Sequence, residues 1–413
     1  MKKKKFDFNF RLILTSKTIS VFGGNILGFA MILFLVDFTQ SAALLGIISA
    51  ISQIPTLFLT PFAGMIADRL DKKKLIVFFD VLTAISNFYF FWLLVTQNYT
   101  ILNITILRMI KMSIMVFART VFNAAVPRVV EEDQLIAANG ALQSIGAIGF
   151  IGGSVIGGIL LGVLGIQTIS FASGTLFLVS AGLSMLIKIP RVKMKEVGGM
   201  LQTVKSDMIE SLKFMINEKP ALFKITLVDS MLTFLLPPIF TVGLPFIVYV
   251  IFGQPVTLSF GIAALGMLIG GFSARSLEKY LAIQHFPKLI ALLGGTGVFL
   301  TLAFMPFLSE RLIAFWIFNI ALALLLFMLA LTNSSLGAFI QKEIPEHLLG
   351  KMNALFDMIS LIAGPLGLLA VGFLIEIVDL PLFFLGTTVI IWIAAVLHHI
   401  ILKNYLKEST EME

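Results

Sequence analysis

Long apolar runs separated by short polar connections dominate this sequence. Hydropathy divides the 413 residues into about twelve such runs. A bilayer core of roughly 30 Å requires about 20 apolar residues per helix, and the runs are of about that length. Closed β-barrels use short alternating segments instead, and the sequence contains none. The pattern predicts an all-α membrane protein with twelve transmembrane helices, near residues 12–36, 44–66, 75–96, 101–122, 138–163, 168–187, 222–250, 257–274, 287–307, 312–334, 352–375 and 381–402.

Composition leads to the same fold class. Hydrophobic residues make up 58% of the chain, charged residues 13%, and the mean hydropathy is +1.01. A soluble domain of this length would need much more polar surface. With no Cys, disulfides, thiolate metal sites and cysteine nucleophiles are excluded. The four histidines (His285, His347, His398 and His399) sit at span ends without ligand spacing.

The chain has a net charge of +7, and its basic residues are concentrated in the connections on one side of the membrane. Connections 37–43, 97–100, 164–167, 252–256, 308–311 and 376–380 contain one basic residue, Arg311. Most of the other basic residues fall at the opposite ends of the spans. Because Lys and Arg mark the cytoplasmic side, we expect both termini of this multi-pass protein in the cytoplasm. We further expect a protein of the cell membrane of a bacterium. This distribution does not indicate a nucleic-acid partner. The lysine-rich start resembles a signal peptide, but we interpret it as part of an uncleaved first span.

The chain is predicted to consist of two similar halves. A polar segment, 188–220, separates a six-helix lobe at 1–187 from a second one at 221–413. Within that segment, apolar residues recur at helical spacing, which predicts an amphipathic helix that tethers the halves at the cytoplasmic membrane surface. Segments 124–142 and 338–356 are weakly alike, 214 residues apart. Such a parallel repeat is the arrangement of paired transporter lobes. The apolar stripe is Leu201, Val204, Met208, Leu212 and Met215, and the repeated positions are Glu132 with Glu346, Leu135 with Leu349 and Asn139 with Asn353.

The hairpin 64–74 concentrates charge between the second and third spans. Its residues include Gly64, Asp68, Arg69 and the basic run Lys72, Lys73 and Lys74. The lysines are typical of a cytoplasmic topology anchor. An Asp at the lip of a helix can instead accept hydrogen bonds from the start of a neighbouring helix. The hairpin resembles the loop between the second and third spans of the major facilitator superfamily. That resemblance implies a cytoplasmic gate, in which Asp68 would cap the eleventh span near Lys351.

The fifth span carries glycine at set intervals. Small residues at this spacing allow helix backbones to approach closely in the membrane. The spacing is similar to the fifth-span signature of facilitator exporters, with Ser154 in the place of proline. The motif comprises Gly140, Gly149, Gly153, Ser154, Gly157 and Gly158, and the preceding loop, 127–139, contains Arg128 as a further gate candidate.

Taken together, the hairpin, this loop and the linker resemble the macrolide-efflux and enterobactin-exporter branch of the superfamily. The resemblance implies alternating access and export of a drug, macrolide or siderophore by an antiporter that uses the proton gradient. It also implies a monomer in the lipid bilayer, without a metal or a cofactor.

Cations also occur inside the predicted spans, where an ionisable group is costly and tends to line a cavity. Arg108, Lys111 and Arg119 of the fourth span fall within about 80° of one another on a helical wheel. The resemblance places a fourth-span arginine in proton-coupled exporters, and alignment by spacing allows either Arg108 or Lys111. In the first span, Lys17 lines the cavity or extends to the surface, and Asn25 is a candidate hydrogen-bonding residue.

Three carboxylates are candidates for carrying a proton: Asp80, Asp229 and Asp357. Asp229 is preferred, because the fold places the seventh span at the cavity. For Asp80 and Asp357 the alternative is a role in bracing cytoplasmic loops. Three prolines, at 237, 238 and 245, are expected to break the seventh span near a gate.

Other functions are weighed against export. The cationic fourth span would also suit the phosphate of a lysophospholipid, and hence a lipid flippase on the same fold. An embedded enzyme is disfavoured because the catalytic and phosphate-binding motifs are missing. A receptor without transport would not need matched halves.

Overall fold

The computed structural model describes residues 7–131, 134–190, 209, 212–306, 310–344 and 346–412. Within these ranges the side chains of residues 61, 68, 136, 151, 346–351, 353, 354, 357 and 408–412 are not described. The predicted amphipathic stripe at 201–215 therefore lies largely outside the described residues. So do the side chains of Asp68, Lys351 and Asp357, and the predictions made for them remain predictions.

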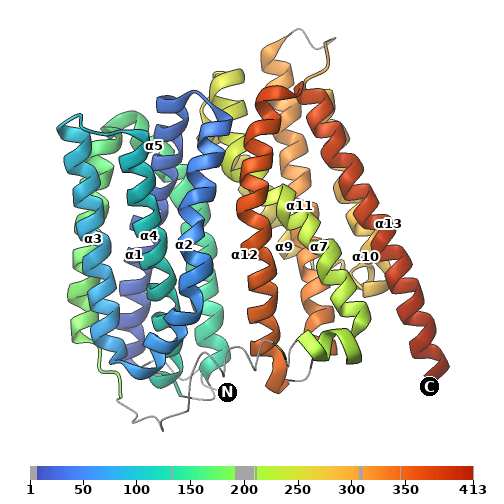
Figure 1. Ribbon diagram of the computed structural model, residues 1–413, viewed down its shortest axis with the longest axis horizontal. Helices are drawn as coiled ribbons and strands as arrows, with labels where there is room; N and C mark the ends of the chain where they lie inside the picture. The colour runs from blue at the N-terminus through green and yellow to red at the C-terminus, as the bar shows by residue number, and fades with distance from the viewer. Residues whose placement is uncertain are drawn as a thin grey trace. The chain divides into compact units, whose positions relative to one another are not determined.

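The regular elements among the described residues are all helical (Figure 1). The first half contains α1 (Phe8–Thr39), α2 (Ala42–Arg69), α3 (Lys72–Val95), α4 (Ile101–Ala125), the short η1 (Val126–Arg128) and α5 (Leu135–Leu186). The second half contains α7 (Pro220–Pro238), α8 (Leu244–Phe246), α9 (Val256–Ser273), α10 (Phe286–Leu302), α11 (Arg311–Glu343), α12 (Glu346–Ile377) and α13 (Leu380–Met412). Short helical segments flank these elements at Phe214–Glu218, Ile239–Gly243, Ile247–Ile251, Glu278–Tyr280 and Ile283–His285.

Eleven helices in the described part of the chain are long and apolar enough to cross a membrane. One of them, α5, has 52 residues and is interrupted at Gly165, whose φ of 75° and ψ of 162° are not helical. Glycine adopts this positive φ without the steric cost that a Cβ would bring. The interruption lies in the predicted connection 164–167, so α5 comprises the fifth and sixth spans. The twelve-helix fold class is thereby confirmed.

The chain divides into two compact units. Unit 1 comprises Met1–Phe38 and Ile48–Met200, and unit 2 comprises Thr39–Ile47 and Leu201–Glu413. The first residues of α2 thus belong to unit 2, although they precede the polar linker by about 150 residues. The sequence did not indicate this feature.

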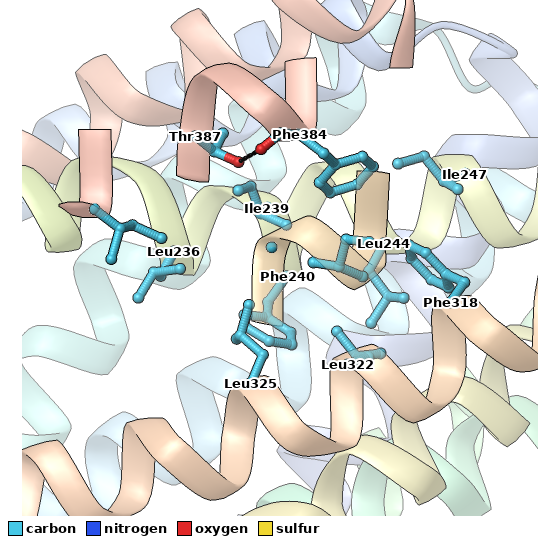
Figure 2. Close-up of a pocket in the computed structure, with 13 residues that line it drawn as sticks. Leu236, Ile239, Phe240, Leu244, Ile247, Phe318, Leu322, Leu325, Phe384 and Thr387 are labelled. Carbon is cyan, nitrogen blue, oxygen red and sulfur yellow. Dashed lines mark hydrogen bonds between the residues drawn. The ribbon is translucent and has the colours of Figure 1, made fainter. Parts of the chain in front are cut away.

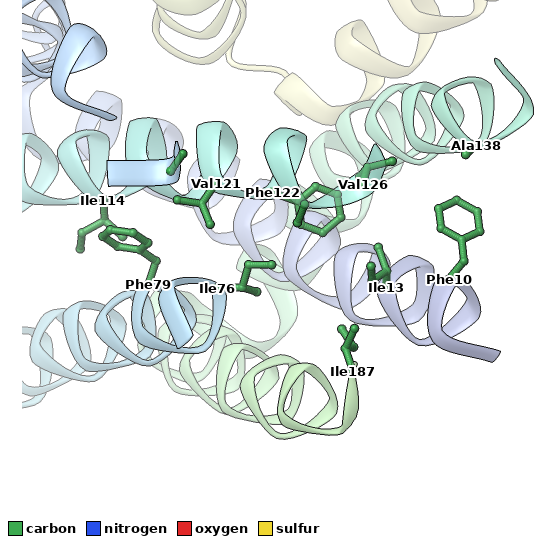
Figure 3. Close-up of a cluster of buried hydrophobic side chains, with 12 residues drawn as sticks. Phe10, Ile13, Ile76, Phe79, Ile114, Val121, Phe122, Val126, Ala138 and Ile187 are labelled. Atoms are coloured by element: carbon green, nitrogen blue, oxygen red, sulfur yellow. The ribbon is translucent and has the colours of Figure 1, made fainter. Parts of the chain in front are cut away.

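A hydrophobic cluster at one end of unit 1 joins α1, α3 and α4. Phe10 and Ile13 come from α1, Phe79 from α3, and Val121 and Phe122 from α4 (Figure 3). All are at most 7% exposed. In a bilayer the tails of the lipids are as apolar as these side chains, so close packing, rather than escape from water, holds such helices together.

Unit 2 is packed around aromatic rings and glycines. Phe252 lies 5.3 to 5.6 Å from Phe304, Phe315 and Phe318, measured between ring centroids. At Gly266 of α9, a Cβ would collide with the backbone carbonyl of α11 residue Ala323. The α9 and α11 backbones can approach this closely only because residue 266 has no side chain.

The expected break at the three prolines does not occur. Pro237 and Pro238 end α7 and Pro245 lies in α8, yet the span is helical from Pro220 to Ile251. Two π-helical segments, Ile239–Gly243 and Ile247–Ile251, adjoin the prolines. Proline lacks an N–H, and the wider π turn lets neighbouring carbonyls find other donors.

Candidate functional site

A seam of serines runs through the interior of unit 1. Ser16 of α1 lies 2.9 Å from the hydroxyl of Ser180 and 2.8 Å from that of Ser184, measured between oxygens. Ser20 lies 2.7 Å from Ser180. About two turns earlier on α5, Ser173 donates to the carbonyl of Gly23 at 2.8 Å. These bonds connect α1 to the second part of α5.

The seam extends to α3 through Asp80. The Ser180 hydroxyl donates to Asp80 Oδ2 at 2.8 Å, and Asp80 is 9% exposed. On α1, the Lys17 ammonium lies 4.4 Å from the centroid of the Phe122 ring, in the geometry of a cation–π contact. Lys17 is attracted electrostatically by Asp80 and repelled by Arg119. The structure thus brings Lys17 and Asp80 into one polar region and attaches Asp80 to another span rather than to a loop.

The three basic residues of α4 differ in exposure. Arg108 is 8% exposed, Lys111 is half-buried, and Arg119 is exposed. The Nε of Arg108 is buried without a hydrogen-bond partner. Among the described side chains, no carboxylate forms an ion pair with Arg108 or Lys111.

The glycine motif of α5 packs on α1. A Cβ at Gly149 would collide with Val21, and one at Gly153 would lie 2.5 Å from the Cβ of Asn25. At Gly157 it would lie 2.7 Å from the carbonyl oxygen of Ile26. Asn25 therefore lies at the crossing of two helices. By contrast, nothing lies within 4 Å of a Cβ at Gly140, and Ser154 in the place of proline is 4% exposed.

The hairpin between α2 and α3 contains an interaction that the sequence did not indicate. The Lys72 ammonium donates to the carbonyl of Ala67 at 2.7 Å, and Lys72 is only 4% exposed. A cation on the last carbonyls of a helix is favoured by the helix dipole. Lys72 thus ties the end of α2 to the start of α3, in addition to any role in topology. The other gate candidates are more open: Arg69 is exposed, Gly64, Lys73 and Arg128 are half-buried, and Gly64 has open space around it.

In unit 2, Asp229 lies on α7 and is half-buried. Its carboxylate forms no hydrogen bond or ion pair with the described residues. His398 is wholly buried on α13, with Nδ1 2.8 Å from the Ala394 carbonyl. For His398 this corrects the expectation that the histidines sit at span ends, because the last span continues to Lys407. His285 lies directly before the start of α10, as expected. The buried His398 ring packs edge-on against Phe286.

A small apolar pocket lies among α7, α10, α11 and α13. Figure 2 shows Leu236, Ile239, Phe318 and Leu325 among the lining residues, with Phe240 beside Leu325. The hydroxyl of Thr387, which also lines the pocket, donates to the Phe384 carbonyl of its own helix at 2.8 Å. The pocket therefore offers apolar contact without a free polar group among these residues.

Unit 2 also contains a carboxylate at the start of α2. Glu376 Oε1 accepts a hydrogen bond from the Ser41 hydroxyl at 2.6 Å and one from the Ala43 backbone N–H at 3.1 Å. Gly46 and Gly372 face each other nearby: a Cβ on either would lie 3.2 Å from the Cα of the other. A carboxylate stabilises a helix start because the first N–H groups have no partner within the helix.

Sequence reasoning missed this contact and the serine seam. Ser173, Ser180 and Ser184 recur at intervals of seven and four, which places them on one helix face, so a signal for the seam was present. Glu376 gave no comparable signal, because its partners lie more than 330 residues away in the chain.

Comparison with known proteins assigns the family. The sequence model of the Major Facilitator Superfamily matches residues 13–368. Macrolide efflux protein A of Streptococcus pyogenes is 25% identical over 402 residues, which are 96% of both chains. An uncharacterized MFS-type transporter of Bacillus subtilis, YkuC, is 22% identical over 98% of this chain and 94% of its own.

Solved structures show the same fold. The POT family transporter PepTSo has a TM-score of 0.76 at 11% identity, over 98% of this chain and 99% of its own. A bacterial homologue of the iron transporter ferroportin, solved in an inward-facing state, has a TM-score of 0.71 at 16% identity, over 96% and 98%. Because the family model covers most of the spans, the chain belongs to the Major Facilitator Superfamily and is a multi-pass membrane transporter of small molecules.

Proposed function

We propose that this transporter exports an amphiphilic small molecule of the drug, macrolide or siderophore kind, by alternating access and in exchange for protons. The observation that carries the proposal is the similarity to Macrolide efflux protein A along 96% of the chain. The apolar pocket of unit 2 and the buried cations of unit 1 support an amphiphilic substrate, since such a molecule has one apolar and one polar part.

Asp229 is the proposed proton carrier. A carboxylate inside a span is costly and is retained chiefly where it has a function. Asp80 is held by Ser180, whereas the carboxylate of Asp229 has no partner among the described residues. An unbound carboxylate can exchange a proton with water each time its side of the transporter opens, which makes Asp229 the better candidate.

Alternating access requires the two units to move against each other. The start of α2 belongs to unit 2, and α2 continues into unit 1 at Ile48. Such a motion would therefore strain α2 or release the contact of Glu376 with Ser41 and Ala43. On the expected topology, this contact lies on the non-cytoplasmic side.

Everted membrane vesicles provide the test. With an imposed proton gradient, we expect wild-type vesicles to accumulate a macrolide or a siderophore and to lose it when a protonophore is added. Asp229→Asn should reduce gradient-driven accumulation at least tenfold and leave exchange without a gradient intact. Asp379→Asn, the same substitution at an exposed position, is the matched control and should behave as wild type. Accumulation that does not respond to the protonophore would contradict proton exchange.

A lipid flippase is the second candidate, favoured by Arg108 and Lys111, which form no ion pair among the described side chains. A lysophospholipid presents a phosphate that two cations can bind. If vesicles translocate lysophospholipid and neither a macrolide nor a siderophore, the flippase is correct and the drug exporter is not.

A further inference from the structure

Arg108 is a buried cation whose charge is not balanced by any described side chain. It lies seven residues after the first residue of α4, which at about 1.5 Å per residue is roughly 10 Å along the helix. The side chain is 8% exposed, and its Nε has no hydrogen-bond partner. An arginine within a span normally pairs with an acid or with backbone carbonyls. In the described part of the chain, Arg108 has neither.

Lys111 increases the imbalance. It follows Arg108 by three residues, so the two side chains share one face of α4, and the like charges repel each other. Asp80 of α3 does not offset them, because it accepts a hydrogen bond from Ser180 and attracts Lys17. Away from helix ends, the described side chains of α1, α3 and α4 thus carry one carboxylate and the cations Lys17, Arg108, Lys111 and Arg119.

The buried residues next to the two cations on α4 are mostly apolar, with Thr105 as a polar exception. Ile104, Leu107 and Ile114 are 0%, 2% and 4% exposed. A cation in such surroundings is costly inside a bilayer. A bound anion would remove much of that cost, and the planar guanidinium binds carboxylate, sulfonate or phosphate through two parallel hydrogen bonds.

We propose that Arg108 and Lys111 form a binding site for the anionic group of the transported amphiphile, a carboxylate, sulfonate or phosphate. This inference rests on the proposed function for its biological meaning, since it names the chemical class of the substrate. The site itself is a property of unit 1 and can be measured without transport.

A matched pair of fluorescent probes tests the site on the full-length protein in lipid nanodiscs. Anilinonaphthalene sulfonate carries a sulfonate, and N-phenylnaphthylamine has the same rings without it. Binding is measured as the fluorescence that remains after subtraction of empty nanodiscs. Arg108→Gln and Lys111→Gln are compared with Arg119→Gln, which removes an exposed cation from the same helix.

We expect Arg108→Gln to weaken sulfonate binding at least tenfold and Lys111→Gln to weaken it several-fold. Both variants should bind the neutral probe as wild type does, which also shows that they are folded. Arg108→Lys should fall between wild type and Arg108→Gln, because it keeps the charge and loses the planar fork. Equal loss of both probes, unchanged sulfonate binding by Arg108→Gln, or an equal effect of Arg119→Gln would overturn the proposal.

The lipid composition distinguishes two sources of the anion. In nanodiscs of phosphatidylcholine with added phosphatidylglycerol, a site that takes a lipid phosphate should bind the sulfonate more weakly. A site that takes a free solute should bind it equally in both lipids, and either result supports an anion site. Because no gradient is used, failed export with intact sulfonate selectivity would refute only the proposed function.

Discussion

In unit 1 a set of buried serines bonds from one helix to another, although Ser52 and Ser86 bond back to their own helix. The buried threonines described in unit 2 bond back to their own helix. Ser180 reaches Ser16, Ser20 and Asp80. In unit 2, Thr301 donates to Gly297 and Thr388 to Phe384, each four residues earlier on the same helix. The contacts between helices of unit 2 include rings and glycine, together with hydrogen bonds at Glu376 and from Trp392 Nε1 to the Ala291 carbonyl.

This difference separates two ways of building a six-helix unit in a membrane. Hydroxyls that bond between helices fix the rotation of each helix and leave polar atoms beside Lys17 and Asp80. Close backbone contact at glycine fixes the helix distance and leaves the interior apolar. We infer that unit 1 presents charged and polar groups to a substrate. We also infer that unit 2 provides apolar surface and the carboxylate of Asp229, which has no partner among the described residues.

The largest effect is expected at the glycine contact of unit 2. Gly266→Ala places a Cβ against the carbonyl of Ala323, and the steric clash can be removed only if α9 and α11 separate. Overpacking of this kind costs about 1 to 3 kcal/mol or more. Gly271→Ala on the same helix has open space and is the control. Thermal denaturation in detergent should show a clear loss of stability for Gly266→Ala only. Equal melting temperatures of the two variants would show that α9 and α11 can move apart at little cost.

The next effect concerns the start of α2, which unit 2 holds through Glu376. Glu376→Gln removes the charge from the two hydrogen bonds to Ser41 and Ala43, which weakens the cap. The chain has no cysteine, so Ala43→Cys gives a single labelling site at a position that is 8% exposed. We expect an impermeant maleimide to label it several-fold faster in the Glu376→Gln background.

Glu310→Gln, an exposed glutamate at the start of α11, is the control for that experiment. If labelling rates are the same in the Glu376→Gln, Glu310→Gln and unaltered backgrounds, the carboxylate does not hold the helix.

A smaller effect is expected within the serine seam. Ser180→Ala removes hydrogen bonds to Ser16, Ser20 and Asp80 and leaves the Asp80 carboxylate without its donor. The loss should be about 1 to 2 kcal/mol, since a buried acceptor is left unpaired. Thr296→Val in unit 2 removes a hydroxyl that bonds to Leu293 of its own helix and should change stability by less. Chemical denaturation of the two variants measures the difference; the reverse order would refute the contrast between the units.

The smallest effect is expected at the hairpin. Lys72→Met keeps the apolar stem and removes the donor to the Ala67 carbonyl, at a cost of about 0.5 to 1 kcal/mol. Lys279 is an exposed lysine in the connection between α9 and α10, so Lys279→Met is the matched control. Proteolysis of the hairpin should be faster for Lys72→Met alone. Identical rates in both variants would show that Lys72 serves topology only.

The cytoplasmic gate remains a prediction from the sequence. We expect Asp68→Asn to insert normally and to lose most of its transport, as the resemblance at 64–74 implies. Lys351, its expected neighbour, and Asp357 have side chains outside those described, so the structure does not test these assignments.

The sequence by itself determined the spans, the family and the expected orientation of the chain. Even the interruption of α5 at Gly165 lies in the connection that hydropathy predicts between the fifth and sixth spans. Apolar runs enter the bilayer and flanking Lys and Arg stay on the cytoplasmic side. Both properties belong to short stretches of sequence, so the spans and their orientation can be predicted without knowing which helices pack together.

Only the tertiary structure decided which polar groups meet. Ser180 bonds to Asp80 across 100 residues, and Glu376 reaches the start of α2. It also decided that Arg108 has no partner among the described residues. A further outcome is that the seventh span remains helical at its prolines, next to π-helical segments. These outcomes depend on how each helix is rotated and which helix lies beside it. That is set by packing along whole helix faces, and no local stretch of sequence contains it.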